Sequence, residues 1–286
     1  MKGAAIPLLI AATAAGAANL APAAGVYGAT LGAGAATAAE RSAFGQNPAA
    51  LMPSAMGLRL DFQRPYGLED LAVAEAGIAV DGAGAGIACD WRATEITGLY
   101  AEHGFRLAPA ARVFRAPGFP GTLDVGYGIA AWRQSAAGSA PAWDFTHEAG
   151  LAWRPWPRLK AGAFAAGLPQ APGRAASARI LGAGLEARSR PPGPSGEEGA
   201  TGQILRLDFR RTGGAPWRAL ASLTVRPFPG VEATVGAATP PFQAAIGMGI
   251  AWRGIRLRQA ARYHRHLGRT WLSGADYGFR GIGKGT

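Results

Sequence analysis

Apolar residues recur at every second position from about residue 56 onward, which is the spacing of one face of a β-strand. In FQAAIGMGIAWR, residues 242–253, one face carries Phe, Ile, Met and Trp, while the other carries Gln, Gly, Ala and Arg. The segments MGLRLDF (56–62), WDFTHEAGLAWR (143–154) and TWLSGADYGF (270–279) repeat this alternation. The sequence therefore predicts a body of two-faced strands, with no helical bundle.

Prolines and glycines divide this body into segments. Proline cannot donate a hydrogen bond to a strand ladder, so Pro155, Pro157, Pro227 and Pro229 mark chain reversals. The segments between such breaks predict roughly fourteen strands of about seven to twelve residues. Their expected centres lie near residues 59, 76, 89, 102, 127, 148, 163, 183, 207, 221, 234, 247, 259 and 275.

Two architectures fit a series of antiparallel hairpins. A soluble sandwich or barrel turns its apolar face inward, whereas a transmembrane barrel turns it outward to lipid around a polar lumen. The second is favoured because the polar face carries charges of both signs and because Trp residues tend to lie near strand ends. The polar-face charges are Asp90, Arg92, Glu102, Arg106, Asp124, Glu148, Lys160, Arg218, Glu232, Arg256 and Arg258, and the Trp residues are Trp91, Trp132, Trp153, Trp217, Trp252 and Trp271.

This pattern predicts an all-β fold, a transmembrane antiparallel up-and-down barrel of about fourteen strands over residues 56–279. Closure also removes the edges that such long apolar strands would otherwise expose. Residues 280–286 then form a C-terminal tail.

The first 23 residues have one positive charge, an apolar stretch and small residues at the end, as in a secretory signal peptide. Cleavage is expected after Ala18 or Ala23. A membrane anchor is the alternative, but the apolar stretch is short and rich in Ala, whereas a spanning helix needs about 20 strongly apolar residues. An exported protein that folds as a transmembrane barrel is expected in an outer membrane of the Gram-negative type. The lipid of that membrane is then an expected partner.

The last strand carries SGADYGF, residues 273–279. Gly274, Tyr277 and Phe279 resemble the C-terminal signal that outer-membrane barrels present to the barrel-assembly machinery. The seven-residue tail departs from that pattern, since most such proteins end at the final aromatic residue. The alternative is an ordinary aromatic strand end within an interfacial girdle.

The stretch FGQNPAAL, residues 44–51, precedes the first strand. Asn is a good helix N-cap and Pro is favoured at the first helical position, so Asn47 and Pro48 predict a short helix from Ala49 to about Met52. A linker with a capped turn is the alternative. With its Gly-rich approach, this stretch resembles the N-terminal hatch of FadL-type transporters and of the related PorV/PorQ-type outer-membrane proteins. The residues that carry the resemblance are Gly28, Gly32, Gly34, Ala38, Ala43, Asn47, Pro48, Ala49 and Leu51.

The resemblance implies that residues 24–55 form a short helical hatch inside the lumen. It also implies passage or binding of small hydrophobic molecules such as long-chain fatty acids, through an apolar lining with a few charged groups. Arg59, Arg92 and Arg106 are the candidates for holding a fatty-acid carboxylate, because guanidinium groups pair with carboxylates in a bidentate way. Strand kinks that release the ligand are expected at Gly77, Gly86 and Gly104, since Gly weakens strand pairing.

Two alternatives stay open. RPYGLEDL, residues 64–71, resembles the first external loop of the PorV-like branch, which implies a barrel that binds a secreted-protein partner. The expected short external loops count against such a docking role. A structural barrel without transport is the third possibility.

Other functions have weak signals. GIGKGT at the C-terminus and DGAGAGIA at 81–88 lack the context of a phosphate-binding loop, so no cofactor is expected. His264 and His266 are spaced to share a strand face, but no metal is expected because no carboxylate or Cys lies near them in sequence. The formal charge of +11 is not gathered into a Lys/Arg block, so nucleic acid is not an expected partner, and no motif indicates an enzyme.

Overall fold

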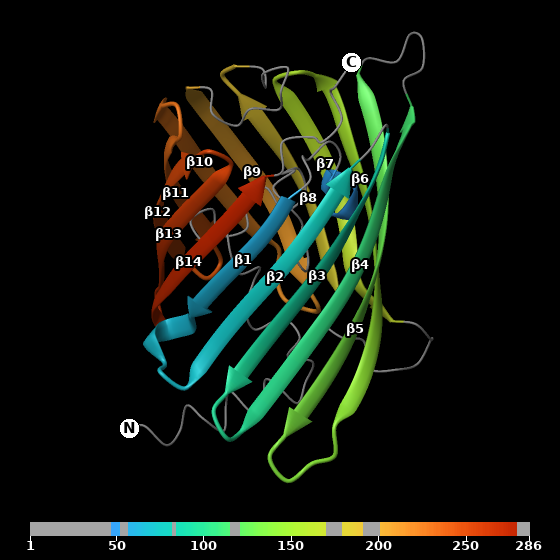
Figure 1. The fold of residues 1–286 in the computed structure, drawn as a ribbon, viewed down its shortest axis with the longest axis vertical. Helices are drawn as coiled ribbons and strands as arrows, with labels where there is room; N and C mark the ends of the chain where they lie inside the picture. The colour runs from blue at the N-terminus through green and yellow to red at the C-terminus, as the bar shows by residue number, and fades with distance from the viewer. Residues whose placement is uncertain are drawn as a thin grey trace.

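The computed structural model describes residues 47–51, 57–81, 84–114, 121–169, 179–190 and 201–278. Its fourteen strands close into one antiparallel barrel, in which each strand pairs with its sequence neighbours and β14 pairs with β1 (Figure 1). The predicted strand count and closed up-and-down topology are confirmed. The strands are β1 (Gly57–Arg64), β2 (Leu71–Asp81), β3 (Ala85–Ile96), β4 (Tyr100–Phe114), β5 (Thr122–Ala136), β6 (Ala142–Trp156), β7 (Leu159–Pro169), β8 (Ile180–Arg188), β9 (Gly202–Thr212), β10 (Arg218–Phe228), β11 (Val231–Thr239), β12 (Gln243–Trp252), β13 (Ile255–His264) and β14 (Gly268–Gly278).

The barrel wall has its polar side chains inside and its apolar side chains outside, the reverse of a soluble protein. Along β1, positions alternate strictly between buried and exposed, with Arg59 and Asp61 inside and Leu58 and Leu60 outside. Large apolar side chains are exposed on the outer surface, including Leu60 at 61% and Met248 at 67%. Such a surface is stable in lipid and costly in water. The predicted outward turn of the apolar face is therefore confirmed.

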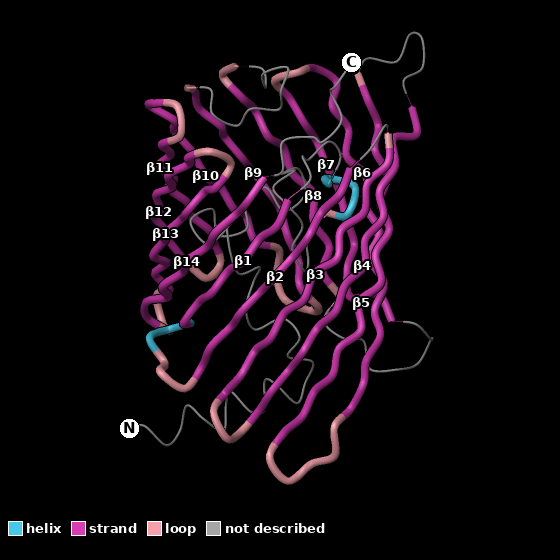
Figure 2. Tube along the Cα trace, in the orientation of Figure 1, coloured by secondary structure: helices cyan, strands magenta, loops and turns pink. Residues whose placement is uncertain are grey.

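The barrel has two distinguishable ends. At the terminal end, β1 begins and β14 stops; at the other, here called the η3 end, the short 3-10 turn η3 (Pro65–Gly67) joins β1 to β2. Figure 2 shows η3 and the second turn, η2 (Pro48–Leu51), as cyan segments toward opposite ends of the barrel. Strands β4, β5 and β6 have 15 residues each, longer than predicted, and the β5–β6 hairpin projects past its neighbours at the η3 end (Figure 1).

The expected helical hatch is not seen among the described residues. Residues 47–51 form a single 3-10 turn, and no α-helix occurs among the described residues. Asn47 is its N-cap as predicted, since its side-chain oxygen accepts a hydrogen bond from the Ala49 N–H at 3.0 Å. The rest of the proposed hatch, the signal peptide, Phe279 and the 280–286 tail lie outside the described residues.

Some expectations for the wall were wrong. Trp132 faces the lumen and is buried, and Trp91 lies near the middle of β3, so neither belongs to an outer girdle at a strand end. Gly77, Gly86 and Gly104 are paired in regular register on both sides, with no bulge at any of them. The expected kinks are therefore absent at these glycines. None of the helical segments in the described ranges is long and apolar enough to cross a membrane.

Candidate functional site: the barrel lumen

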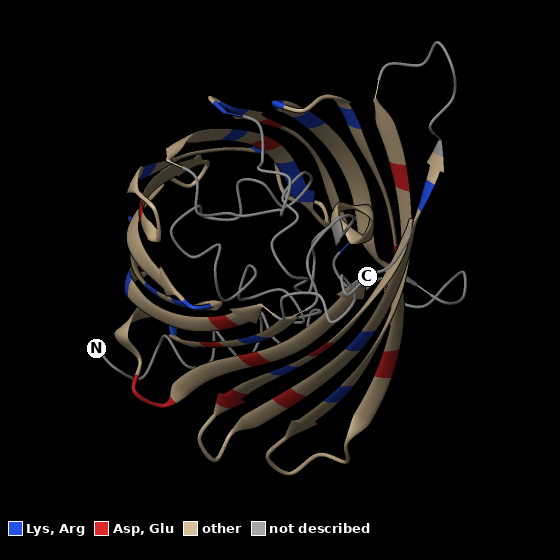
Figure 3. Ribbon diagram, turned by 45° about the horizontal axis from the view of Figure 1, so that its top comes forward, with Lys and Arg blue, Asp and Glu red and all other residues tan. Residues whose placement is uncertain are grey.

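The lumen wall is lined mainly by polar and charged side chains. Acidic and basic positions recur around the wall (Figure 3), and many of them are buried against the inside of the barrel. The expected apolar lining with a few charged groups was therefore wrong for the described residues. Period two explains this outcome, because the strands that show Leu and Ile to lipid must show their Arg, Asp and Glu positions to the lumen.

Arg59 lies in a network of charges near the β1–β2 seam. Its Nε lies 2.8 Å from Asp61 Oδ2, and its Nη2 donates to Glu75 Oε2 at 3.1 Å. Arg92 Nε lies 3.7 Å from the other oxygen of Glu75. All of these side chains are at most 5% exposed. The two arginines thus already face carboxylates from the wall itself.

Arg106 connects three strands of the wall. Its Nη1 donates to Asp90 Oδ2 on β3 at 3.0 Å, and its Nε donates to Glu148 Oε2 on β6 at 2.6 Å. Asp90 is its cross-strand partner in the register, whereas Glu148 reaches it from beyond β5. Small residues between them make this reach possible, since the lumen-facing β5 positions nearby are Gly128 and Ala130.

These contacts bear on the three arginines proposed to hold a carboxylate ligand. The structure brings Arg59 and Arg92 together at Glu75 and places Arg106 between Asp90 and Glu148. Their role toward a ligand stays a prediction. A ligand carboxylate at these positions would have to compete with Asp61, Glu75, Asp90 and Glu148.

Several lumen-facing side chains lie flat over a glycine on the adjacent strand. A Cβ atom on Gly77 would contact the Asp90 carboxylate, and one on Gly104 would contact the Trp132 ring. In each case the glycine and the larger residue are direct partners in the register. The same relation holds for the pairs Gly128–Glu148, Gly182–Phe164, Gly184–Asp208, Gly249–Glu232 and Gly274–Asp61. The glycines thus keep bulky groups against the wall and out of the central space.

The turn η2 is docked on the inner face of the wall near the terminal end. It contacts β3, β4, β5 and β6, and Asn47 to Ala50 are buried. Asn47 Nδ2 donates to the Leu151 carbonyl at 2.7 Å, and Lys160 Nζ donates to the Ala50 carbonyl at 3.5 Å. Cβ atoms on Gly126 or Gly150 would collide with this turn. Described residues of the proposed hatch motif therefore lie in the lumen, on a seat made by two glycines.

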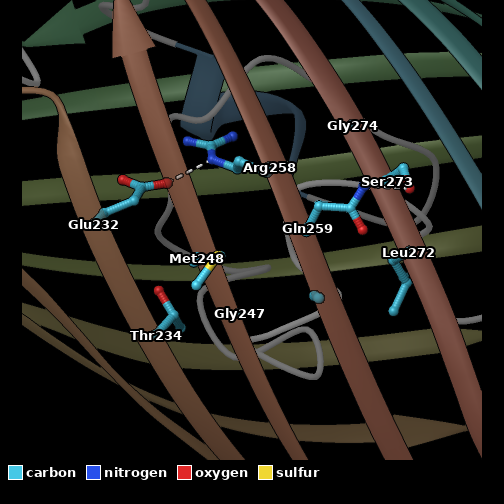
Figure 4. A pocket seen from close by; sticks show the side chains of 10 residues that line it. Glu232, Thr234, Gly247, Met248, Arg258, Gln259, Leu272, Ser273 and Gly274 are labelled. Atoms are coloured by element: carbon cyan, nitrogen blue, oxygen red, sulfur yellow. Dashed lines mark hydrogen bonds and ion pairs between the residues drawn. The ribbon is translucent and has the colours of Figure 1, made fainter.

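A second set of charges lies on β11, β13 and β14, next to the Arg59 network, since Asp276 on β14 is the direct cross-strand partner of Arg59. Glu232 on β11 accepts a hydrogen bond from Arg258 Nε at 2.6 Å, and Arg258 Nη1 donates to Asp276 at 2.7 Å. The Glu232–Arg258 pair borders a small pocket among β11, β12, β13 and β14 (Figure 4). The pocket is lined by residues of both faces, including lumen-facing Thr234 and outward-facing Met248.

The C-terminal motif residues have structural roles of their own. Gly274 faces the lumen and leaves room for Asp61, whereas Tyr277 faces outward and is 42% exposed. Recognition by assembly machinery stays a prediction for Gly274, Tyr277 and Phe279.

The two histidines near the end of β13 do not share a strand face. His264 ends β13 with its side chain buried, while His266 lies exposed in the following turn. His264 Nδ1 accepts hydrogen bonds from the backbone N–H groups of His266 and Leu267, so the ring closes the turn. Among the described residues, no group of three or more His, Cys, Asp or Glu is placed to hold a metal ion.

Comparisons with known proteins point to the fold alone. No family model matches the chain, and no characterised protein matches its sequence. A monoaromatic hydrocarbon channel, CymD, superposes with a TM-score of 0.64 at 12% identity over 92% of this chain and 99% of its own. The Acinetobacter baumannii outer membrane protein Omp33 superposes with a TM-score of 0.53 at 6% identity over 79% of this chain and 99% of its own.

These similarities and the inverted wall agree on one conclusion. The chain is a β-barrel of the Gram-negative outer-membrane type, with the fold of outer-membrane channels. The resemblance to FadL-type and PorV/PorQ-type proteins has no support from a family model.

Sequence reasoning missed the partners of the site. Glu148 was expected on the polar face, but its pairing with Arg106, and that of Arg59 with Asp61 and Glu75, depends on register and on side-chain reach. The seat for η2 was also missed. A signal for it existed in the period-two pattern, which assigns both Gly126 and Gly150 to the lumen face.

Proposed function

We propose that this protein is an outer-membrane channel for small hydrophobic molecules, such as long-chain fatty acids, with η2 closing part of its terminal end. The observation that carries the proposal is the docking of Asn47–Leu51 against the lumen wall of a closed barrel. A purely structural barrel has no need for a lumenal turn seated on two glycines. In a channel, a turn held inside the lumen can restrict leakage.

The similarity to a hydrocarbon channel supports small hydrophobic cargo, although it is a likeness of fold. The polar wall favours cargo that is amphipathic over pure hydrocarbon. A polar lumen lowers the cost of burying a polar group at one end of the molecule, and at Arg59 that group would compete with Glu75. In this proposal the terminal end faces the periplasm, and the η3 end faces the outside of the cell.

Binding of cargo is tested with the purified full-length barrel. A fluorescent fatty acid is added in detergent, and its displacement by unlabelled fatty acid and by a monoaromatic hydrocarbon is measured. Saturable binding at about one molecule per barrel is expected. Equal signals from the folded and the heat-unfolded protein would contradict the proposal.

A PorV-like partner-binding barrel is the second candidate. Its supporting observation is the β1–β2 turn, in which Leu68 is 44% exposed beside exposed Glu69 and Asp70. Affinity purification from native membranes separates the candidates. If a secreted protein co-purifies in stoichiometric amount and is lost when Leu68→Ser is introduced, the partner-binding role is favoured. If the barrel is recovered alone, the channel is favoured.

A further inference from the structure

Three lumen-facing arginines gather near the η3 end, away from the networks described above. Arg210 near the end of β9 is the direct cross-strand partner of Arg218 at the start of β10. Arg262 lies near the end of β13, paired with Thr270 on β14. Arg218 lies within electrostatic range of Arg210, Arg262 and His264. Like charges placed directly opposite each other destabilise a strand pair, so this arrangement has a cost that some other function must offset.

Some lumen-facing side chains between these arginines are short. Lumen-facing Ala238 on β11 and Ala245 on β12 separate Arg218 from Arg262, and both are buried. Their side chains are too short to screen the guanidinium groups from each other. Arg218 and Arg262 interact electrostatically across this stretch, and Leu220 on β10 packs with the two alanines in one apolar cluster.

Among the described residues, fewer carboxylates lie beside this cluster than beside Arg59 or Arg106. Asp208 lies two residues from Arg210 on the same face and interacts with it. Within the described part of the chain, Nε and Nη2 of Arg218 are buried without a hydrogen-bond partner. Counted over the described residues alone, three arginines and one aspartate carry a net charge of about +2. By contrast, Arg59 and Arg106 each contact two carboxylates.

The turn η3 supplies a rim for this cluster. The Tyr66 N–H donates to Thr270 Oγ1 at 3.0 Å, which fixes η3 against β14 beside Arg262. The Tyr66 and His264 rings meet edge to face with centroids 6.2 Å apart. Tyr66 interacts electrostatically with both Arg218 and Arg262. Tyr66 of η3 therefore lies at the edge of the arginine cluster, at the η3 end of the lumen.

We propose that Arg210, Arg218 and Arg262 form a binding site for small oxyanionic groups, carboxylate or phosphate, at the η3 mouth of the lumen. Guanidinium groups present forked donors that match both oxyanions, and an oxyanion between them offsets their mutual repulsion. Rings of Arg and Lys line pores that select anions. The site requires no hydrophobic cargo, so it stands apart from the function proposed above.

The test measures unfolding of the purified full-length barrel in detergent and urea. Sodium phosphate or sodium acetate is compared with sodium chloride at constant ionic strength. A site in the folded state predicts a saturable rise of the unfolding midpoint with the oxyanion. Removing one charged donor is expected to raise the half-saturating oxyanion concentration about tenfold or more, because such hydrogen bonds contribute about 1.5–3 kcal/mol. The two salts distinguish phosphate from carboxylate preference.

Matched variants make the result decisive. Arg218→Gln and Arg262→Gln are expected to lose most of the oxyanion effect, while Arg211→Gln, on the outward face next to Arg210, keeps it. Without oxyanion, Arg218→Gln is expected to unfold at the same or a higher urea concentration, because the repulsion from Arg210 is relieved. Equal stabilisation of all proteins, or a less stable Arg218→Gln barrel in chloride, would overturn the proposal.

Discussion

Asn47 Oδ1 lies 1.8 Å from the position that a Cβ atom on Gly150 would take. The two residues are far apart in sequence, and the contact is reinforced by the hydrogen bond from Asn47 Nδ2 to the Leu151 carbonyl. A loop segment can approach a strand backbone this closely only where the strand has no side chain. The position of η2 in the lumen therefore depends on a glycine of the wall as much as on the turn itself.

Gly150→Val is expected to displace η2 while leaving β6 intact, because Val suits a strand but its side chain collides with Asn47. Single-channel recordings should then show a larger or more often open conductance. Ala149→Val is the matched control, since Ala149 is the neighbouring residue on the outward face. Identical conductance in both variants would mean that η2 does not restrict the lumen.

Asn47→Ala removes the N-cap and the hydrogen bond to Leu151, at a cost of about 1 kcal/mol for the cap alone. Hydrogen exchange of the Ala49 and Ala50 amides should become faster. Asn47→Asp keeps the acceptor for the Ala49 N–H and loses the donor to Leu151, so an intermediate rate is expected. Unchanged exchange in Asn47→Ala would show that packing alone holds the turn.

Arg106→Gln leaves Asp90 and Glu148 facing each other without their shared cation. We expect a loss of about 1–3 kcal/mol in the free energy of unfolding, measured with urea in detergent. Replacing Glu148 by Gln in the same chain should restore part of this loss, because one buried charge is then removed. Two losses that simply add would indicate that Arg106 and Glu148 are not coupled.

Ile246→Arg tests whether the outer surface lies in lipid. Ile246 is 62% exposed near the middle of β12, and a charge there is expected to cost about 2–4 kcal/mol. Phe242→Arg, just before β12 begins, should cost about 0–1 kcal/mol because it lies near the interface. Folding into lipid vesicles under urea measures both. Equal costs would place the middle of β12 outside the bilayer core.

The sequence predicted the barrel well, for a simple physical reason. Period-two alternation can be read from a short stretch of sequence. In segments such as 242–253 or 56–62 it predicts which face of the strand each residue occupies. Trp132 shows the limit of composition-based reasoning. Its position in the alternation assigned it to the lumen, but its residue type suggested an outer girdle, and the register partner Gly104 settled the matter by giving the ring space.

The site was less accessible from sequence. Arg59, Arg92 and Arg106 were correctly expected on the lumen face, yet the identity of their partners depends on which strand lies opposite and how far a side chain reaches. The Arg210–Arg218 pair was not anticipated for the same reason. The two residues are eight apart across a turn, and only the register shows that they are direct neighbours.

Passage of small hydrophobic molecules through this barrel can be measured as the entry of a labelled long-chain fatty acid into whole cells that carry the full-length protein in their outer membrane. We expect a saturable initial rate above that of cells without the protein, and a higher rate with Gly150→Val. If the wild-type protein and Gly150→Val both fold but give the same rate as cells without the protein, fatty acids do not pass through this barrel.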